Sequence, residues 1–144
     1  MELMQFAQKH AVLISTLAVC VILLIIEEAN SFFGAEYELD PEKALVLQHK
    51  NATILDIRDK KSFNQAHIDH AENVSAELLK HSPEKVLKRD QNYIIYCEEG
   101  SESLELASSL RKKHGYKLYT ITGGYNNWCA EGFNSKPSKT TPST

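Results

Sequence analysis

The sequence has few of the residues that build disulfide frameworks or metal centres. Its three cysteines, Cys20, Cys97 and Cys129, are an odd number and lie far apart in the chain. No CxxC, HxxxH or HExxH pattern occurs among these cysteines and the six histidines. We therefore predict that the cysteines are reduced and that the chain has no metal site.

The sequence also lacks a strong excess of one charge. Sixteen Lys and Arg stand against nineteen Asp and Glu, and the formal net charge is -3. The bases are scattered along the chain, whereas a nucleic-acid-binding protein needs them gathered into a stripe or patch. We therefore expect no nucleic acid among its partners. The length of 144 residues suits one folded core.

One long apolar run is present near the N-terminus. Residues 11–26 contain sixteen residues without a charge. A helix of this length spans about 24 Å, close to the roughly 30 Å of a bilayer core. We predict that residues 1–28 form a single-pass membrane anchor helix. A buried core helix and a cleaved signal peptide are the alternatives, and Glu27 and Glu28 after the run disfavour cleavage.

The orientation of this anchor rests on two opposing observations. Lys9 lies before the span and acids follow it, which by the positive-inside rule favours a domain outside the cytoplasm. A reactive thiol such as that of Cys97 persists more easily in a reducing cytosol. We predict the inner membrane of a bacterium, with the domain in the cytoplasm.

After the anchor, short apolar runs alternate with helical patterns. Strands are predicted over residues 53–57, 93–96 and 117–121, with helices between them. This alternation predicts an α/β fold, a small parallel sheet with helices on both faces. We assign residues 29–39 to a linker, residues 40–133 to the domain, and the Ser-, Thr- and Pro-rich residues 134–144 to a disordered tail.

Cys97 is the residue best placed to carry chemistry. It follows the strand at 93–96 and precedes a helical pattern, and Gly100 lets the loop between them curl its amides inward. Convergent N–H groups at a helix start stabilise a thiolate and hold a persulfide or oxyanion above it. For an isolated cysteine at a strand end, a half-buried inert thiol is the more common alternative.

Four motifs surround Cys97 in the sequence. They are LDIR at 55–58, AHI at 66–68 followed by AENV at 71–74, YCEEGSES at 96–103, and GGYNNW at 123–128. In this order they closely resemble the motifs of the rhodanese family. The resemblance extends from Asp40 to Phe133. It implies a rhodanese-like fold and a sulfurtransferase that uses no cofactor, with Cys97 as the nucleophile that accepts sulfur.

The resemblance also implies roles for residues around Cys97. The backbone amides of the substrate-binding loop would bind the transferred sulfur, and this loop comprises Glu98, Glu99, Gly100, Ser101 and Glu102. Asp56 and Arg58 would support the site, with an ordinary surface ion pair as the alternative, and His67 would serve packing and hydrogen bonding. Gly123, Gly124 and Trp128 would define the fold and not the activity.

The loop differs from two related patterns. Related cell-cycle phosphatases need one residue more and an arginine where Ser103 stands, which excludes a phosphatase. Many single-domain rhodaneses carry a base in the loop, often at the position of Glu102, whereas this loop holds three acids. These carboxylates should oppose an anionic donor such as thiosulfate.

Two hypotheses follow from this acidic loop. In the first, the chain is a sulfurtransferase that takes sulfur from thiosulfate or a persulfide and passes it to a small thiol or a protein cysteine. In the second, it is a catalytically weak or inactive rhodanese-fold module that binds a protein partner, such as a membrane protein, at the membrane.

Overall fold

The computed structural model describes residues 1–137, except for the side chains at position 7 and positions 30–35. The chain divides into two compact units, Met1–Glu36 and Tyr37–Thr144. Residues 138–144 of the predicted disordered tail lie outside the described residues.

The first unit consists of two helices, α1 (Glu2–Lys9) and α2 (Ala11–Ala35). Residues 1–28, predicted to form one anchor helix, thus belong to two helices, because the chain leaves helical geometry at His10, whose N–H caps α1 by bonding to the Phe6 carbonyl. Within α2, Ala11–Ala29 is long and apolar enough to cross a membrane, a property that signal sequences share. None of this span is buried, which argues against a core helix.

The predicted linker, residues 29–39, is wrong at both ends. Helix α2 continues to Ala35, and strand β1 (Glu38–Leu39) joins the sheet of the second unit. Thr120 N donates to the Tyr37 carbonyl at 2.8 Å, and the second compact unit begins at Tyr37. A two-residue strand is too short to show the alternation by which strands are recognised in a sequence.

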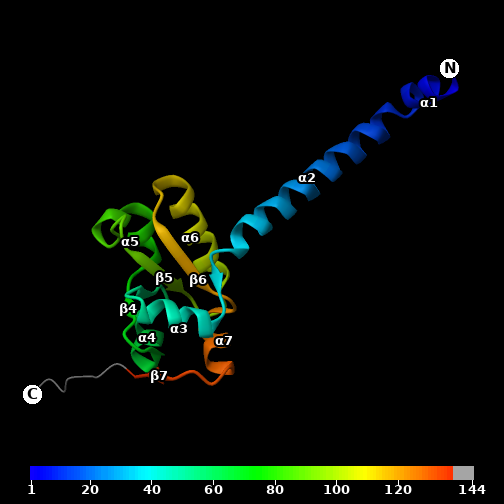
Figure 1. The fold of residues 1–144 in the computed structure, drawn as a ribbon. Helices are drawn as coiled ribbons and strands as arrows, with labels where there is room; N and C mark the ends of the chain where they lie inside the picture. The colour runs from blue at the N-terminus through cyan, green and yellow to red at the C-terminus, as the bar shows by residue number, and fades with distance from the viewer. Residues whose placement is uncertain (138–144) are drawn as a thin grey trace, which may run out of the picture. The chain divides into compact units, whose positions relative to one another are not determined.

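The sheet of the domain has five strands (Figure 1). Its order is β1, β6 (Lys117–Ile121), β5 (Asn92–Tyr96), β2 (Thr53–Asp56), β4 (Glu72–Asn73), and every neighbouring pair is parallel. The three predicted strands are thus the three central ones. The two edge strands, β1 and β4, were not predicted.

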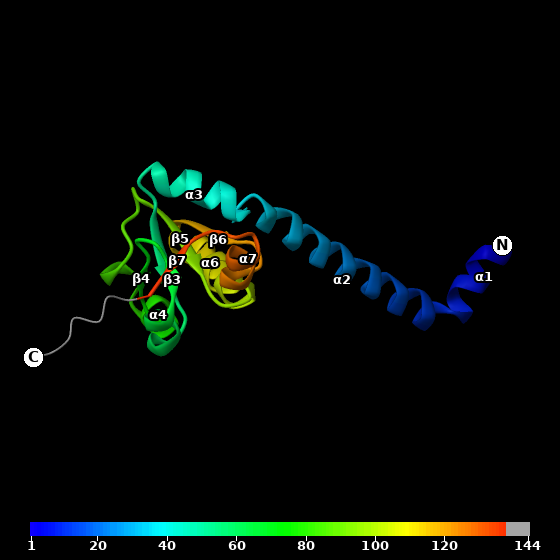
Figure 2. The ribbon, with the colours of Figure 1, turned by 90° about the horizontal axis from the view of Figure 1, so that it is seen from below.

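Helices cover both faces of this sheet (Figure 2). On one face, α5 (Ala76–His81) and α6 (Ser101–His114) contribute Leu79, Leu106 and Leu110 to a hydrophobic core. On the other face, α3 (Pro41–His49) and α7 (Gly124–Ala130) contribute Ala44 and Trp128 to a second core. The predicted α/β fold, with a parallel sheet and helices on both faces, is confirmed.

The remaining elements lie beside the main sheet. They are α4 (Lys60–Gln65), the short 3-10 helix η1 (Pro83–Lys85), and an antiparallel pair of β3 (His67–Ile68) with β7 (Ser135–Lys136). Strand β7 shows that the predicted tail begins too early. Its pairing with β3, and an ion pair between Lys136 and Asp69, tie Ser135 and Lys136 to the domain.

The topology brings two of the predicted motifs to one edge of the sheet. Strands β2 and β5 are parallel neighbours, and their register pairs Asp56 with Tyr96. Because the carboxyl ends of parallel strands lie at the same edge, Asp56, Arg58 and Cys97 all emerge there. The adjacent α-helical and loop segments build the candidate site on this edge.

Candidate active site

The Cys97 sulfur lies at the floor of a tight loop between β5 and α6. Cys97 as a whole is only 5% exposed. Gly100 N donates to Sγ at 3.1 Å and Ser103 N at 3.4 Å, while Ser103 Oγ lies 3.4 Å from the same sulfur. Amide donors that converge on a sulfur atom stabilise negative charge on it. This geometry suits the nucleophilic role predicted for Cys97.

Gly100 makes this curl of the loop possible. Its φ of 96° lies in the left-handed region that side chains disfavour, and it precedes the first turn of α6. Amides in a first helical turn have no acceptor within their own helix. In α6 these include the amides of Ser101 and Glu102, which remain available to an anion above the sulfur.

Ser103 belongs to the site although it lies outside the predicted loop of residues 98–102. It is completely buried, and its hydroxyl donates to the Gly100 carbonyl at 3.0 Å. It shares the buried side of α6 with Leu106, Ala107 and Leu110. A polar residue on an otherwise apolar helical stripe is the signal by which Ser103 could have been found.

The start of α7 holds the loop from the other side. Tyr125 N donates to the Cys97 carbonyl at 2.9 Å, and Asn126 N donates to the Glu98 carbonyl at 3.0 Å. A side chain on Gly124 would place its Cβ only 2.5 Å from the Cys97 carbonyl oxygen and 2.6 Å from Gly100 N. Gly124 therefore shapes the site, which goes beyond the purely architectural role expected of the GGYNNW motif.

Asp56 and Arg58 form a buried pair at the end of β2, and the alternative of a surface ion pair is wrong. Asp56 is completely buried and the Arg58 side chain is 6% exposed. The Asp56 carboxylate accepts Arg58 Nη2 at 2.9 Å and the Tyr96 hydroxyl at 2.6 Å. Burial and the Asp56 carboxylate raise the pKa of Tyr96 well above its usual value, so this hydroxyl remains a donor.

Arg58 connects this pair to the loop. Its Nη1 donates to Glu98 Oε2 at 3.0 Å, and its guanidinium lies 3.9 Å from the centre of the Tyr125 ring. Burial by itself would lower the pKa of Arg58, but hydrogen bonds to Asp56 and Glu98 raise it above its usual value. One of the three loop carboxylates is thereby compensated. Glu99 and Glu102 make no salt bridge with the described residues.

His67 packs against α4 and contacts its backbone. Its Nδ1 lies 2.8 Å from the Phe63 carbonyl, and its ring stacks on Phe63 with 3.9 Å between the centroids. The adjacent backbone completes the buried network, because the Ala66 carbonyl accepts Arg58 Nη2 at 2.7 Å and Ile68 N donates to the Tyr96 hydroxyl at 3.2 Å.

Tyr96 is a second residue that the sequence did not indicate. We expect Tyr96→Phe to lower the free energy of unfolding by about 1–3 kcal/mol, because Ile68 N and Asp56 would each lose a buried hydrogen-bond partner. Urea denaturation of the full chain in detergent measures this. Tyr119→Phe is the control, since that hydroxyl bonds to no described residue, and an equal loss in both variants would contradict the role of the network.

The described residues contain no group of three or more His, Cys, Asp or Glu side chains that could hold a metal ion.

Comparison with known proteins agrees with this geometry. Residues 40–131 match the family described as the rhodanese-like domain. The chain belongs to the rhodanese-like family. The match covers the whole segment that carries Asp56, Arg58, Cys97 and Gly124, so the resemblance stated from the four motifs is confirmed.

Individual relatives are similar over the same segment. The thiosulfate sulfurtransferase GlpE of Tolumonas auensis is 30% identical over 87 residues, which are 60% of this chain and 81% of the relative. The protein of the same name from Shewanella oneidensis is 34% identical over 79 residues, or 55% and 77% of the two chains. These relatives support the prediction of a sulfurtransferase.

A solved structure shows the same fold. The crystal structure of a rhodanese-related protein from Thermoplasma volcanium superposes with a TM-score of 0.61 at 24% identity. It covers 69% of this chain and 97% of the other.

Proposed function

We propose that this chain is a membrane-anchored sulfurtransferase that carries sulfane sulfur as a persulfide on Cys97. The observation that carries the proposal is the pair of N–H groups, from Gly100 and Ser103, that point at the Cys97 sulfur from a loop held by α7. This arrangement favours a charged sulfur nucleophile and offers further helix-start amides to a second sulfur atom.

The first half-reaction loads the enzyme. The Cys97 thiolate attacks the outer sulfur of thiosulfate, the S–S bond of the donor breaks, and sulfite leaves with the electron pair. The product is Cys97–S–S⁻, whose charge is shared with the loop amides. A low-molecular-weight persulfide serves in the same way, and the leaving group is then a thiolate.

The second half-reaction removes the sulfur atom from Cys97. The thiolate of an acceptor, a small thiol or a protein cysteine, attacks the terminal sulfur, and the Cys97 thiolate leaves with the electron pair. Both steps exchange one sulfur–sulfur bond for another, so neither requires an external oxidant or a cofactor. The amides of Gly100 and Ser103 stabilise the leaving Cys97 sulfur as its charge returns.

Mass spectrometry tests the proposal directly. After exposure to thiosulfate or polysulfide, the peptide that contains Cys97 should gain about 32 Da, the mass of one sulfur atom, and lose it on addition of a thiol. Cys129 is exposed and free, so its peptide is an internal control for unspecific sulfuration. If Cys97 gains no sulfur from any donor, the binding-module hypothesis replaces the enzyme.

We further propose that α2 anchors the domain to the cytoplasmic face of a bacterial inner membrane. The span Ala11–Ala29 has a mean hydropathy of 2.4 and none of it is buried in the protein. The full chain should remain in membranes after carbonate extraction. In intact cells, the exposed Cys129 should escape a membrane-impermeant thiol reagent, and its labelling would overturn the cytoplasmic orientation.

A further inference from the structure

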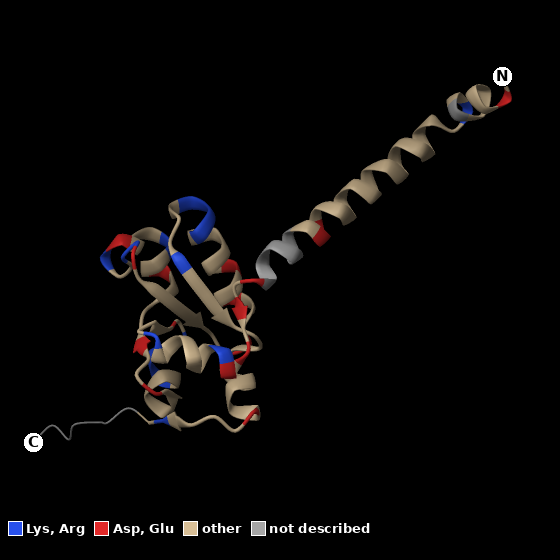
Figure 3. Ribbon diagram, in the orientation of Figure 1, with Lys and Arg blue, Asp and Glu red and all other residues tan. Residues whose placement is uncertain are grey.

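Bases that are spread along the sequence lie together at one end of the domain, where β5 and β6 begin and α6 ends (Figure 3). Between residues 111 and 117 the chain carries four bases and no acid. Three more bases precede β5. We call the set the basic surface: Lys85, Lys88, Arg89, Arg111, Lys112, Lys113 and Lys117.

Acids do not neutralise the basic surface. Glu84 and Asp90 lie near it in the chain, and the charge of Glu38 acts on Arg111, but no base of the surface forms a salt bridge with a described residue. Every one of its Lys side chains is exposed. Bases in the last turn of α6 interact favourably with the helix dipole, yet Lys85, Lys88 and Lys117 lie outside that helix and the dipole does not explain them.

Arg111 lines a cavity within the basic surface. The cavity has a volume of about 340 Å³ and is lined by Tyr37, Arg111, Gly115, Tyr116, Lys117 and Tyr119. The Arg111 guanidinium lies 4.3 Å from the centre of the Tyr37 ring, and its Nη1 donates to the Leu118 carbonyl at 2.8 Å. It forms no salt bridge with a described residue, and Glu38 acts on it only from beyond 4.0 Å, so its guanidinium can still pair with an anion.

The position of Tyr37 in the chain limits what this cavity can reach. Tyr37 follows the last residue of α2 by two positions and forms part of the cavity wall. The helix continues six residues beyond the apolar span Ala11–Ala29, a length of about 9 Å. This is roughly one Debye length at physiological salt. If α2 crosses the bilayer, the domain therefore starts within the headgroup region.

We propose that the basic surface binds the anionic phospholipid headgroups of the membrane that holds α2. Arg111 and Lys117 bind a headgroup phosphate at the cavity, and Lys112 and Lys113 contact neighbouring headgroups. The tyrosines of the cavity wall suit the membrane interface, where an apolar ring and a polar hydroxyl are both accommodated. This inference rests on the proposed anchor.

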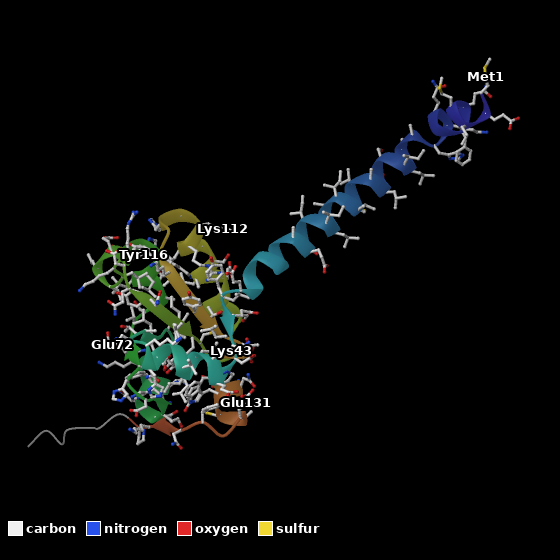
Figure 4. All side chains as sticks on the ribbon, viewed as in Figure 1. Met1, Lys43, Glu72, Lys112, Tyr116 and Glu131 are labelled. Atoms are coloured by element: carbon white, nitrogen blue, oxygen red, sulfur yellow. The ribbon has the colours of Figure 1, made fainter. Side chains whose placement is uncertain are left out.

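Binding in this way also orients the active site. Lys112 and Tyr116 lie at the end of the domain where α6 ends (Figure 4), whereas Cys97 follows the opposite, carboxyl end of β5. Docking through the basic surface therefore turns the Cys97 loop away from the bilayer and toward soluble sulfur donors. Glu99 and Glu102 reinforce the orientation, because anionic lipids repel them.

Lysine footprinting of the full chain in nanodiscs tests the proposal. One set of discs contains phosphatidylcholine alone, and the other contains phosphatidylcholine mixed with phosphatidylglycerol. With phosphatidylglycerol, acetylation of Lys112, Lys113 and Lys117 by a water-soluble reagent should fall by about threefold or more, and high salt should restore it. Lys60 and Lys61, exposed at the other end of the sheet, are internal controls and should not change.

Matched variants distinguish headgroup binding at the cavity from a general attraction between the positive domain and the anionic membrane. Arg111→Gln should lose most of the protection of Lys117, and Lys60→Gln should retain it. Both variants should still load sulfur on Cys97, which shows that they are folded. Equal acetylation of the basic surface in the two kinds of disc would overturn the proposal. The proposal would also be overturned if nucleic acid protected these lysines from acetylation and phosphatidylglycerol did not.

The failure of the anchor gives a different result. Extraction of the chain by carbonate would refute the anchor alone. In that case, cosedimentation of the chain with phosphatidylglycerol vesicles is measured instead. If the unchanged chain cosediments and Arg111→Gln does not, the headgroup site is still supported. If the unchanged chain does not cosediment, the headgroup site is overturned.

Discussion

Cys97→Ser is expected to reduce sulfur transfer by about a thousandfold or more, since an alkoxide at this position is a far weaker nucleophile and leaving group than a thiolate. The substitution removes the only sulfur atom on which the amides of Gly100 and Ser103 converge. The fold should survive, because serine is of similar size and the Ser103 hydroxyl can bond to it. Transfer of sulfur from thiosulfate to cyanide or to a thiol measures the effect.

Cys129→Ser is the matched control for this experiment. Cys129 is exposed and one residue from Trp128, and no hydrogen bond among the described residues joins it to Cys97. Activity in this variant should equal that of the unchanged chain. Equal losses in the two variants would mean that sulfur passes through both cysteines, and the assignment of Cys97 as the sole carrier would have to be abandoned.

Gly124→Ala should also impair the site, although it removes no reactive group. The new Cβ would lie 2.5 Å from the Cys97 carbonyl oxygen, 2.6 Å from Gly100 N and 2.8 Å from the Glu98 carbonyl oxygen, all of them backbone atoms. Relief of these contacts requires the loop to separate from α7. We expect a loss of activity of at least about tenfold, because catalytic groups must stay close to their productive geometry.

Gly132→Ala is the control that distinguishes the effect of this contact from the effect of backbone strain. Gly132 has a φ of 80°, close to the 61° of Gly124, but a Cβ on it would meet nothing within 4 Å. Both variants should lose about 1–2 kcal/mol of stability from the left-handed conformation. Only Gly124→Ala should also lose sulfur loading of Cys97. If Gly132→Ala loses as much activity, the contact between α7 and the loop is not the cause.

The buried network changes how the acidic loop is understood. From the sequence, three carboxylates oppose an anionic donor. In the structure, Arg58 neutralises Glu98 and is itself held by Asp56, which also accepts the Tyr96 hydroxyl. Repulsion of an anionic donor is therefore expected only from Glu99 and Glu102. Both side chains are exposed, so water and dissolved salt screen their charges.

Local patterns in the sequence were sufficient for the central features of the protein. Strands β2 and β5 carry short continuous apolar runs, and a parallel strand buried on both faces shows this pattern whatever its neighbours are. The position of Cys97 between a strand and a helix, with Gly100 after it, is also a local property. For this reason the fold class could be predicted, and Cys97 could be singled out as the candidate nucleophile.

Contacts between distant segments decided the rest. Two-residue strands such as β1 and β7 exist only because a partner strand supplies their hydrogen bonds. Three features of the structure involve residues that are far apart in the chain. They are the close approach of Gly124 to Cys97, the hydrogen bond from Arg58 to Glu98, and the cluster of bases where β5 and β6 begin. Periodicity and propensity report the conformation of a segment and carry no information on which other segment will pack against it. Only the tertiary structure could determine these features.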